Sequence, residues 1–213
     1  MNKNKNAIEI TSHCSRCGIC CQKNSPSLHL DDLEKLQSGA IPKNQLITYR
    51  KGEWVYDNII DQYIRLEQDM IKPIENTTNG FCTFYLPDQQ SCLIYENRPL
   101  ECQLQACYDP EPLKQRYETD RLQRRDIFPS NSAIWEFIEY HESKCSLSIF
   151  QHIVPFSDHH LSEKDISLFK EMIRFDYHFR FTLHKRIGLQ NTEMNFILGR
   201  SVENLLKQLR VII

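Results

Sequence analysis

The sequence predicts an α+β protein: a small, irregular, metal-organised cysteine-rich domain with short strands, followed by a helical C-terminal region. All nine cysteines lie at or before position 145, in segments that are short and interrupted by turn residues. Residues 161–187 contain neither glycine nor proline, which is typical of a long helix. We therefore expect a cysteine-cluster domain over residues 1–145, with a helical insertion at about 111–143, and a helical region over 146–213 that packs on it.

The cysteine-rich half is expected to contain one short helix and several strands. Residues 27–37 carry leucines three positions apart, with acidic residues in the first turn and a glycine after the last, and they predict a helix. Residues 45–56 are rich in β-branched and aromatic residues and predict strand, with a turn at Lys51–Gly52. Residues 81–95 predict two short strands around the turn-forming Pro87–Asp88.

Helices are expected in most of the remaining chain. Residues 111–127 and 131–143 have helical patterns and are separated by Pro129. A last helix is expected over Thr192–Val211. Together these segments predict that the helical content rises towards the C-terminus.

Residues 161–187 fit two periods. Their aromatic residues alternate with polar ones as in a strand, but their apolar residues also recur at helical spacing. Helix is favoured because Ser162 and Asp165 resemble a capping box at its start.

Length, charge and hydropathy exclude several classes of protein. A chain of 213 residues buries roughly 70% of its unfolded surface, so nine cysteines are more than packing requires. The balance of 26 basic and 28 acidic residues argues against a nucleic-acid-binding protein. The polar N-terminus and the lack of any apolar run near 20 residues predict neither a secretory signal nor a membrane partner. We expect a cytoplasmic protein with reduced thiols, so the tightly spaced cysteines indicate metal ligation.

The first cysteine motif is C-x2-C-x2-C, formed by Cys14, Cys17 and Cys20. This spacing lets a tightly wound loop direct three thiolates to one centre, as in bacterial ferredoxins. Gly18 suits a loop backbone that turns with positive φ near a metal. Cys21 follows Cys20 directly, so one of the pair is expected to face a second metal or the opposite side of a cluster.

A second group of cysteines is marked by its surrounding residues. Cys82, Cys92 and Cys102 are widely spaced, and the segment CLIYENRPLEC runs from Cys92 to Cys102. With CSRCGICC over 14–21, this segment resembles the YkgJ-type CxxCxxCC cysteine-cluster family, described as zinc- or iron-chelating proteins. The family's second motif, C-x-I-Y-x-x-R-P-x-x-C, matches here, and Cys82 matches an upstream cysteine of the family.

The resemblance implies seven metal-ligating cysteines and leaves the eighth open. Family members commonly have arginine where this chain has Gln103, and they tend to carry a further cysteine downstream. That cysteine is either Cys107 or Cys145. We favour Cys145, with Cys107 as a structural thiol.

The metal is expected to be bound by thiolates alone, a ligand set that suits zinc and iron–sulfur clusters. The C-x2-C-x2-C spacing favours an iron–sulfur cluster, preferably [4Fe-4S], over zinc. The flagellin lysine-N-methylases, which look related through the same cysteine pattern, are associated with such a centre.

Three functions remain open at this stage. The first is a cytosolic metal-binding protein that acts in electron transfer, metal handling or as an accessory factor. The second is a cluster-dependent enzyme, for example a protein-modifying methyltransferase by analogy with the flagellin enzymes. The third is a structural zinc module that serves a protein partner. The sequence shows no catalytic triad spacing, P-loop, Rossmann fingerprint or HExxH motif, which favours the first.

Several residues beside the cysteines have alternative interpretations. Arg98 is a candidate to donate hydrogen bonds to cluster sulfurs, to bind an anionic substrate, or to form an ion pair with a nearby acid. His141-x3-Cys145 is a candidate ligand pair, although a histidine near a thiol is more often not a ligand. The basic stretch over 121–125 is expected to form a solvated helix face.

Overall fold

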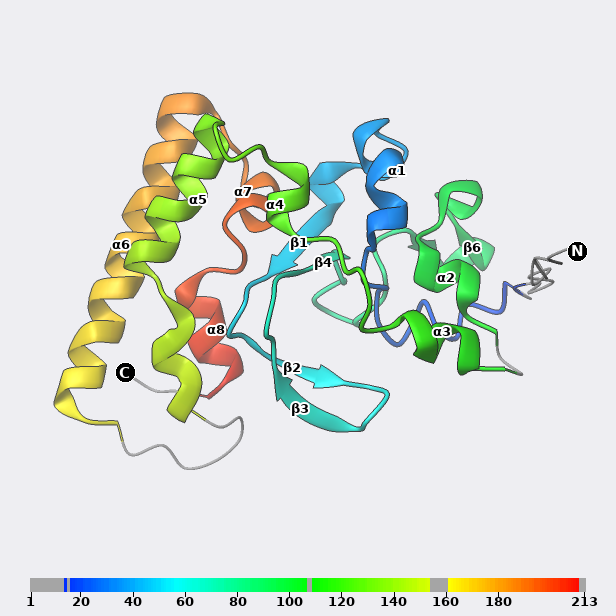
Figure 1. Ribbon diagram of the computed structural model, residues 1–213, viewed down its shortest axis with the longest axis horizontal. Coiled ribbons are helices and arrows are strands. Elements are labelled where there is room, and N and C mark those ends of the chain that lie inside the picture. The colour runs from blue at the N-terminus through cyan, green and yellow to red at the C-terminus, as the bar shows by residue number, and fades with distance from the viewer. Residues whose placement is uncertain (1–13, 15, 107–108, 154–160, 211–213) are drawn as a thin grey trace, which may run out of the picture.

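A computed structural model describes residues 14, 16–106, 109–153 and 161–210. With about 47% helix and 13% strand, the architecture is α+β with a helical C-terminal region, as the sequence predicted. Figure 1 shows a long molecule, with the cysteine-rich segments at one end and the two longest helices side by side at the other.

The described strands form three separate antiparallel pairs. The pairs are β1 (Leu46–Tyr49) with β4 (Met70–Pro73), β2 (Trp54–Asp57) with β3 (Gln62–Arg65), and β5 (Tyr85–Leu86) with β6 (Ser91–Cys92). The two short strands expected around Pro87 are therefore present as β5 and β6. The turn expected at Lys51–Gly52 is also present: the Glu53 amide donates to the Arg50 carbonyl across it at 3.0 Å, and Gly52 has a positive φ.

The strands on either side of that turn do not pair with each other. Tyr49 of β1 lies opposite Met70, whereas Trp54 of β2 lies opposite Arg65. The turn is held by its own side chains, since the Arg50 amide donates to Glu53 Oε1. The sequence pattern did not predict β3 or β4, because four-residue strands of mixed polarity have no distinct period.

The described α-helices follow in chain order. They are α1 (Leu33–Gln37), α2 (Leu100–Leu104), α3 (Glu111–Arg116), α4 (Arg124–Ile127), α5 (Ala133–Lys144), α6 (Glu163–Ile187), α7 (Asn191–Ile197) and α8 (Val202–Gln208). The helical interpretation of 161–187 is confirmed by α6. Its N-terminus has the expected capping box, in which the Asp165 amide donates to Ser162 Oγ at 3.1 Å.

Two predicted helices are wrong in their continuity. Residues 111–127 form α3 and α4 with an extended segment between them, because Leu122 is fully buried and its amide donates to the Leu28 carbonyl. Residues 192–211 form α7 and α8, separated at Gly199, which has a φ of +77°. A Cβ at Gly199 would lie 2.7 Å from Arg50 Cγ, so the break is the point at which the chain closes over a buried arginine.

The expectation for the basic stretch 121–125 is also wrong. Arg121 and Arg124 are buried, and only Arg125 is exposed. Arg124 pairs with Asp69 at 2.6 Å and with Glu142 at 2.7 Å, which joins α4 to the loop before β4 and to α5. Acidic partners distant in sequence therefore decide the placement of Arg124, whereas Arg121 donates to the Tyr117 carbonyl.

Two hydrophobic clusters hold the chain together. The first includes Leu46, Ile71, Cys82, Phe84 and Phe196, and so joins the strands, the cysteine-rich segments and α7. The second lies between the end of α5 and the helices α6 and α8. The C-terminal helices thus share a core with the cysteine-rich half, which fixes the region beneath the candidate site.

Candidate metal centre

The first cysteine motif lies in a loop without regular structure. Cys14, Cys20 and Cys21 line a cavity of about 560 Å³. The loop turns at Gly18, whose φ is +75°, and a Cβ there would lie 2.1 Å from the hydroxyl of Tyr85. Glycine is therefore required both for the backbone conformation and for the close approach of β5.

The loop is tied to the second cysteine group through the backbone. The Cys82 amide donates to the Cys21 carbonyl at 2.9 Å, which brings these two residues to the same wall of the cavity. Cys92 lies on β6, opposite Tyr85 of β5, and also lines the cavity. The β5–β6 hairpin therefore supplies one ligand candidate and the tyrosine that supports the loop.

Cys102 is positioned by α2. The helix begins after Pro99, and its first amide, that of Leu100, donates to both oxygens of Asp32. The carboxylate of Glu101 accepts from the Ser27 amide at 2.8 Å and pairs with His29 at 3.1 Å. These buried contacts fix α2 so that Cys102 faces the cavity.

Six of the nine predicted ligands therefore line one cavity, although no three of their sulfurs are among the described ligand atoms that lie within 4.8 Å of one another. They are Cys14, Cys20, Cys21, Cys82, Cys92 and Cys102. None of the described residues that line the cavity is a histidine, so the nitrogen ligands of mixed zinc sites are absent from that wall. An all-sulfur set of this kind suits zinc, Cu(I) or iron–sulfur clusters.

The other three cysteines are placed differently. Cys17 is exposed and is not part of the described cavity wall. Cys107 lies outside the described residues. Cys145 is fully buried directly after α5, a helix that lies at the opposite end of the molecule from α2 and β6 (Figure 1).

The cavity thiols influence one another electrically. Burial raises the pKa of Cys82 to about 11 and raises the pKa of Cys92 and of Cys102. The charges of Cys82, Cys20 and Cys92 add to the effect on the Cys102 pKa. Hydrogen bonding with Cys21, whose sulfur is 4.0 Å away, lowers the pKa of Cys20 to about 6 and raises the Cys21 pKa. A bound metal cation would offset this repulsion between thiolates with its positive charge, so that the thiols lose their protons on binding.

Two arginines lie beside the thiol group on the ring of Tyr95. Arg98 and Arg16 both lie over the ring of Tyr95, at 4.3 Å and 3.9 Å from its centroid. The Arg98 charge acts to lower the pKa of Cys92. Among the described residues, Arg98 forms no ion pair with Glu96 or Glu101, and its Nη1 donates to the Tyr95 carbonyl. It thus stabilises the thiolate form of a neighbouring cysteine.

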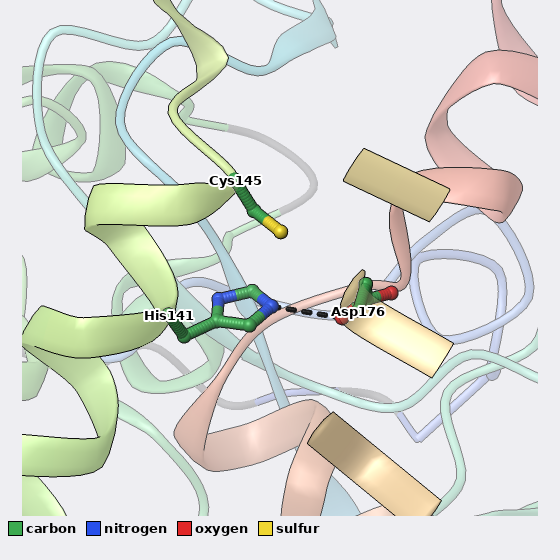
Figure 2. A group of neighbouring side chains, drawn as sticks. All are labelled: His141, Cys145 and Asp176. Carbon is green, nitrogen blue, oxygen red and sulfur yellow. Dashed lines mark hydrogen bonds and ion pairs between the residues drawn. The ribbon is translucent and has the colours of Figure 1, made fainter. Parts of the chain in front are cut away.

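A second group of potential ligand atoms lies in the helical end. Figure 2 shows Cys145 and His141 of α5 pointing towards Asp176 of α6, and their ligand atoms lie within 4.8 Å of one another. All three residues are buried. Their donor types are those of a metal site.

The contacts of these three residues are already those of a helix-joining network. Asp176 Oδ1 accepts from His141 Nε2 at 2.8 Å and from Arg180 Nε at 2.7 Å, and Oδ2 accepts from the Val202 amide at 3.0 Å. Burial lowers the pKa of His141, and the charges of Arg50 and Arg180 act in the same direction. Positive charge beside the group and occupied carboxylate oxygens favour a structural role over a cation site.

Comparison with known sequences decides the family. A sequence model of the CxxCxxCC family, described as a "putative zinc- or iron-chelating domain", matches residues 13–146. The chain belongs to this family. No curated protein and no solved structure gives a significant match. The family match of this CxxCxxCC protein ends at residue 146, so the helices α6, α7 and α8 lie outside it.

A helix that crosses a membrane must be both long and apolar. None of the helices in the described part of the chain combines the length and the apolar character needed to cross a bilayer.

Some functional residues had no distinct signal in the sequence. The supporting residues Tyr85, Asp32 and Glu101 act through contacts made between distant segments. Only the glycine at position 18 was predicted from its place in the motif, and its positive φ is confirmed.

Proposed function

We propose that the six cavity cysteines hold a thiolate-ligated centre with more than one metal ion, preferably an iron–sulfur cluster such as [4Fe-4S], rather than a single zinc ion. The observation that supports this is that six cysteines line one cavity. The protein would then act in electron transfer, in metal handling or as an accessory factor for another protein.

The number and arrangement of thiols favour a polynuclear centre. A tetrahedral zinc site takes four ligands, so a single zinc ion would leave two of the six thiols unused. Cys20 and Cys21 are adjacent in the chain, yet both line the same cavity. Adjacent ligands at one wall suit a centre with several metal ions better than a single ion.

Cys145 is not part of this proposed ligand set. It follows α5, which lies at the other end of the molecule (Figure 1), and its Sγ donates to the Met172 carbonyl at 3.8 Å. Its burial in the second hydrophobic cluster supports a packing role for this thiol. Cys17, which is exposed, remains a predicted ligand by its motif alone.

The test is metal and sulfide analysis of protein produced with adequate iron and purified without oxygen. We expect iron, acid-labile sulfide and visible absorption in constant proportion to the protein. Stoichiometric zinc without iron or sulfide would overturn the iron–sulfur proposal and favour the zinc module.

A matched pair of variants tests the ligand set. Cys102→Ser removes a thiol from the cavity wall and is expected to lose most of the bound metal. Cys145→Ser replaces a fully buried thiol away from the cavity and is expected to keep the full metal content. Equal metal loss in both variants would contradict the assignment.

A further inference from the structure

The cavity extends well beyond the six cysteines. Its volume of about 560 Å³ lies within the range of small-molecule sites, which run from about 300 to 1,000 Å³. Away from the thiols its wall includes Val55, Ile64, Leu113 and Tyr117, which come from β2, β3 and the segment around α3. This part of the cavity is mainly apolar and aromatic, so it suits the body of an organic ligand.

The acidic residues of the wall are already satisfied by the protein. Asp57 accepts from the Ile59 amide at 2.8 Å, and Glu75 accepts from the Ser25 amide at 2.8 Å and from Lys72 at 3.1 Å. Glu101 is held by Ser27 and His29. These carboxylates are therefore held by hydrogen bonds within the protein, Asp57 by backbone amides and Glu75 and Glu101 by side chains as well.

Arg121 differs from the other charged residues of the wall. Its side chain is 8% exposed, its Nε donates to the Tyr117 carbonyl at 2.8 Å, and its guanidinium lies over the Tyr117 ring. Its Nη2 is buried without a hydrogen-bond partner, and no described acidic side chain forms an ion pair with it. An unpaired buried guanidinium is costly in free energy, and an oxyanion would supply the two acceptors that its planar fork matches.

The other arginines of the wall are committed elsewhere. Arg200 pairs with Glu53, and Arg98 lies on Tyr95 beside Cys92. Arg124, close to Arg121 in the chain, pairs with Asp69 and Glu142. Arg121 is thus the cationic residue of the described wall that is both buried and without an acidic partner or a neighbouring thiolate.

We propose that the cavity binds a small organic ligand with an oxyanion head, a carboxylate or a phosphate, which Arg121 receives, and an apolar body, which packs against Val55, Ile64 and Tyr117 beside the thiolate centre. This inference rests on the proposed function in one respect, namely that the neighbouring thiols hold a metal centre. The binding site itself is formed by residues outside the cysteine motifs.

The test is calorimetric titration of the metal-loaded protein with three matched probes: benzoate, phenyl phosphate and neutral benzyl alcohol. We expect one of the two anions to bind with a Kd on the order of 1 mM or tighter, and benzyl alcohol to bind at least tenfold more weakly. Comparison of the two anions distinguishes a carboxylate from a phosphate head. Equal binding of the alcohol and the anions, or no binding of either anion at millimolar concentrations, would overturn the proposal.

Variants at two neighbouring arginines identify the anion partner. Arg121→Gln is expected to weaken binding of the preferred anion by at least tenfold, as for the loss of a charge-assisted hydrogen bond. The control, Arg125→Gln, removes an exposed charge four positions away and is expected to leave the affinity unchanged. If Arg121→Gln does not fold, Arg121→Lys replaces it as the test variant. Lysine keeps the charge without the planar fork, so this variant should bind the anion with intermediate affinity. Equal weakening by both glutamine variants would contradict a specific role for Arg121.

Metal content measured on the same samples separates the two proposals. Arg121→Gln should retain the metal content of the wild type, because it lies outside the thiol group. A protein with full metal content that fails the titration would refute only the oxyanion site. A protein that binds the anion but holds no stoichiometric metal would refute only the metal centre.

Discussion

At the scale of single residues, the cysteine loop depends on the absence of a side chain at position 18. Gly18 combines a positive φ with a contact in which a Cβ would overlap the Tyr85 ring and hydroxyl. Tyr85 is itself held in the core, where it packs edge-on against Phe81. The loop therefore cannot accept a methyl group by moving a flexible surface side chain.

Gly18→Ala is expected to lose metal and to lower the free energy of unfolding by about 2–4 kcal/mol, the sum of backbone strain and overpacking. Gly39→Ala is the matched control, because Gly39 has a similar φ of +79° but nothing within 4 Å of its added Cβ. The control should cost about 1 kcal/mol and keep its metal. Urea unfolding and metal analysis of both variants measure the difference, and equal effects would refute the steric role of Tyr85.

At the scale of elements, helices α5, α6 and α8 are joined by buried polar contacts centred on Asp176. This carboxylate of α6 accepts from His141 of α5, from Arg180 one turn later and from the first amide of α8. Hydrogen bonding from His141 and the charge of Arg180 hold the pKa of Asp176 at about 2 despite its burial. The Asp176 carboxylate thereby joins α5, α6 and α8 through hydrogen bonds that specify their relative positions.

Asp176→Asn is expected to destabilise the protein by about 3–5 kcal/mol, because it leaves buried partners without their negative charge. Glu203→Gln removes the acid of an exposed pair with Lys207 at the same i, i+4 spacing, and should change stability by at most about 0.5 kcal/mol. Denaturant unfolding at neutral pH compares the two. A loss of under 1 kcal/mol in Asp176→Asn would show that this network does not hold the helices.

The same network predicts how stability depends on pH. Burial lowers the pKa of His141 below its ordinary value of about 6.5, so the unfolded chain takes up a proton first as the pH falls. Stability should be constant above about pH 7 and should decline below about 6.5. A further decline is expected between about pH 4 and pH 2, where Asp176 protonates first in the unfolded chain.

Unfolding midpoints of the wild type and of His141→Gln at pH 7.5 and pH 5.5 measure the histidine contribution. The wild type should lose more stability between these two conditions than the variant. An equal loss in both proteins would assign the acid sensitivity to other groups.

At the scale of the whole molecule, the cysteine-rich end has little regular structure of its own, whereas the opposite end consists of packed helices (Figure 1). β5 and β6 are two residues each, and the loop of the first motif is held by few backbone hydrogen bonds. Metal ligation by this end would supply cross-links that its short elements do not provide.

Removal of the metal is therefore expected to act unevenly. Amide hydrogen exchange should accelerate by about tenfold or more in residues 16–24 and 82–104 after chelation, whereas the amides of α6 should change much less. Exchange measured by mass spectrometry on loaded and chelated protein distinguishes the segments. Uniform acceleration along the chain would show that the metal supports the whole fold.

Local patterns were sufficient where neighbouring residues make the deciding contacts. The capping box and uninterrupted helical spacing specify α6, and Pro87 marks the turn between β5 and β6. The predicted helix at 111–127 failed because the Leu122 backbone pairs with Leu28, a contact between segments far apart in the chain. The helix at 192–211 failed because the buried Arg50 occupies the space beside Gly199.

The sequence by itself determined the fold class, the family and the set of candidate thiol ligands, because a metal-ligand motif is a local pattern of residue types and spacings. Only the tertiary structure decided which cysteines line the cavity. It places six of them there through the Cys21–Cys82 backbone contact, the β5–β6 pair and the Asp32-capped α2, and it places Cys145 in a helical core. It also decided that Arg121 is buried without an acidic partner. Ion pairing depends on distances between segments that are far apart in the chain, and these distances cannot be read from local sequence spacing.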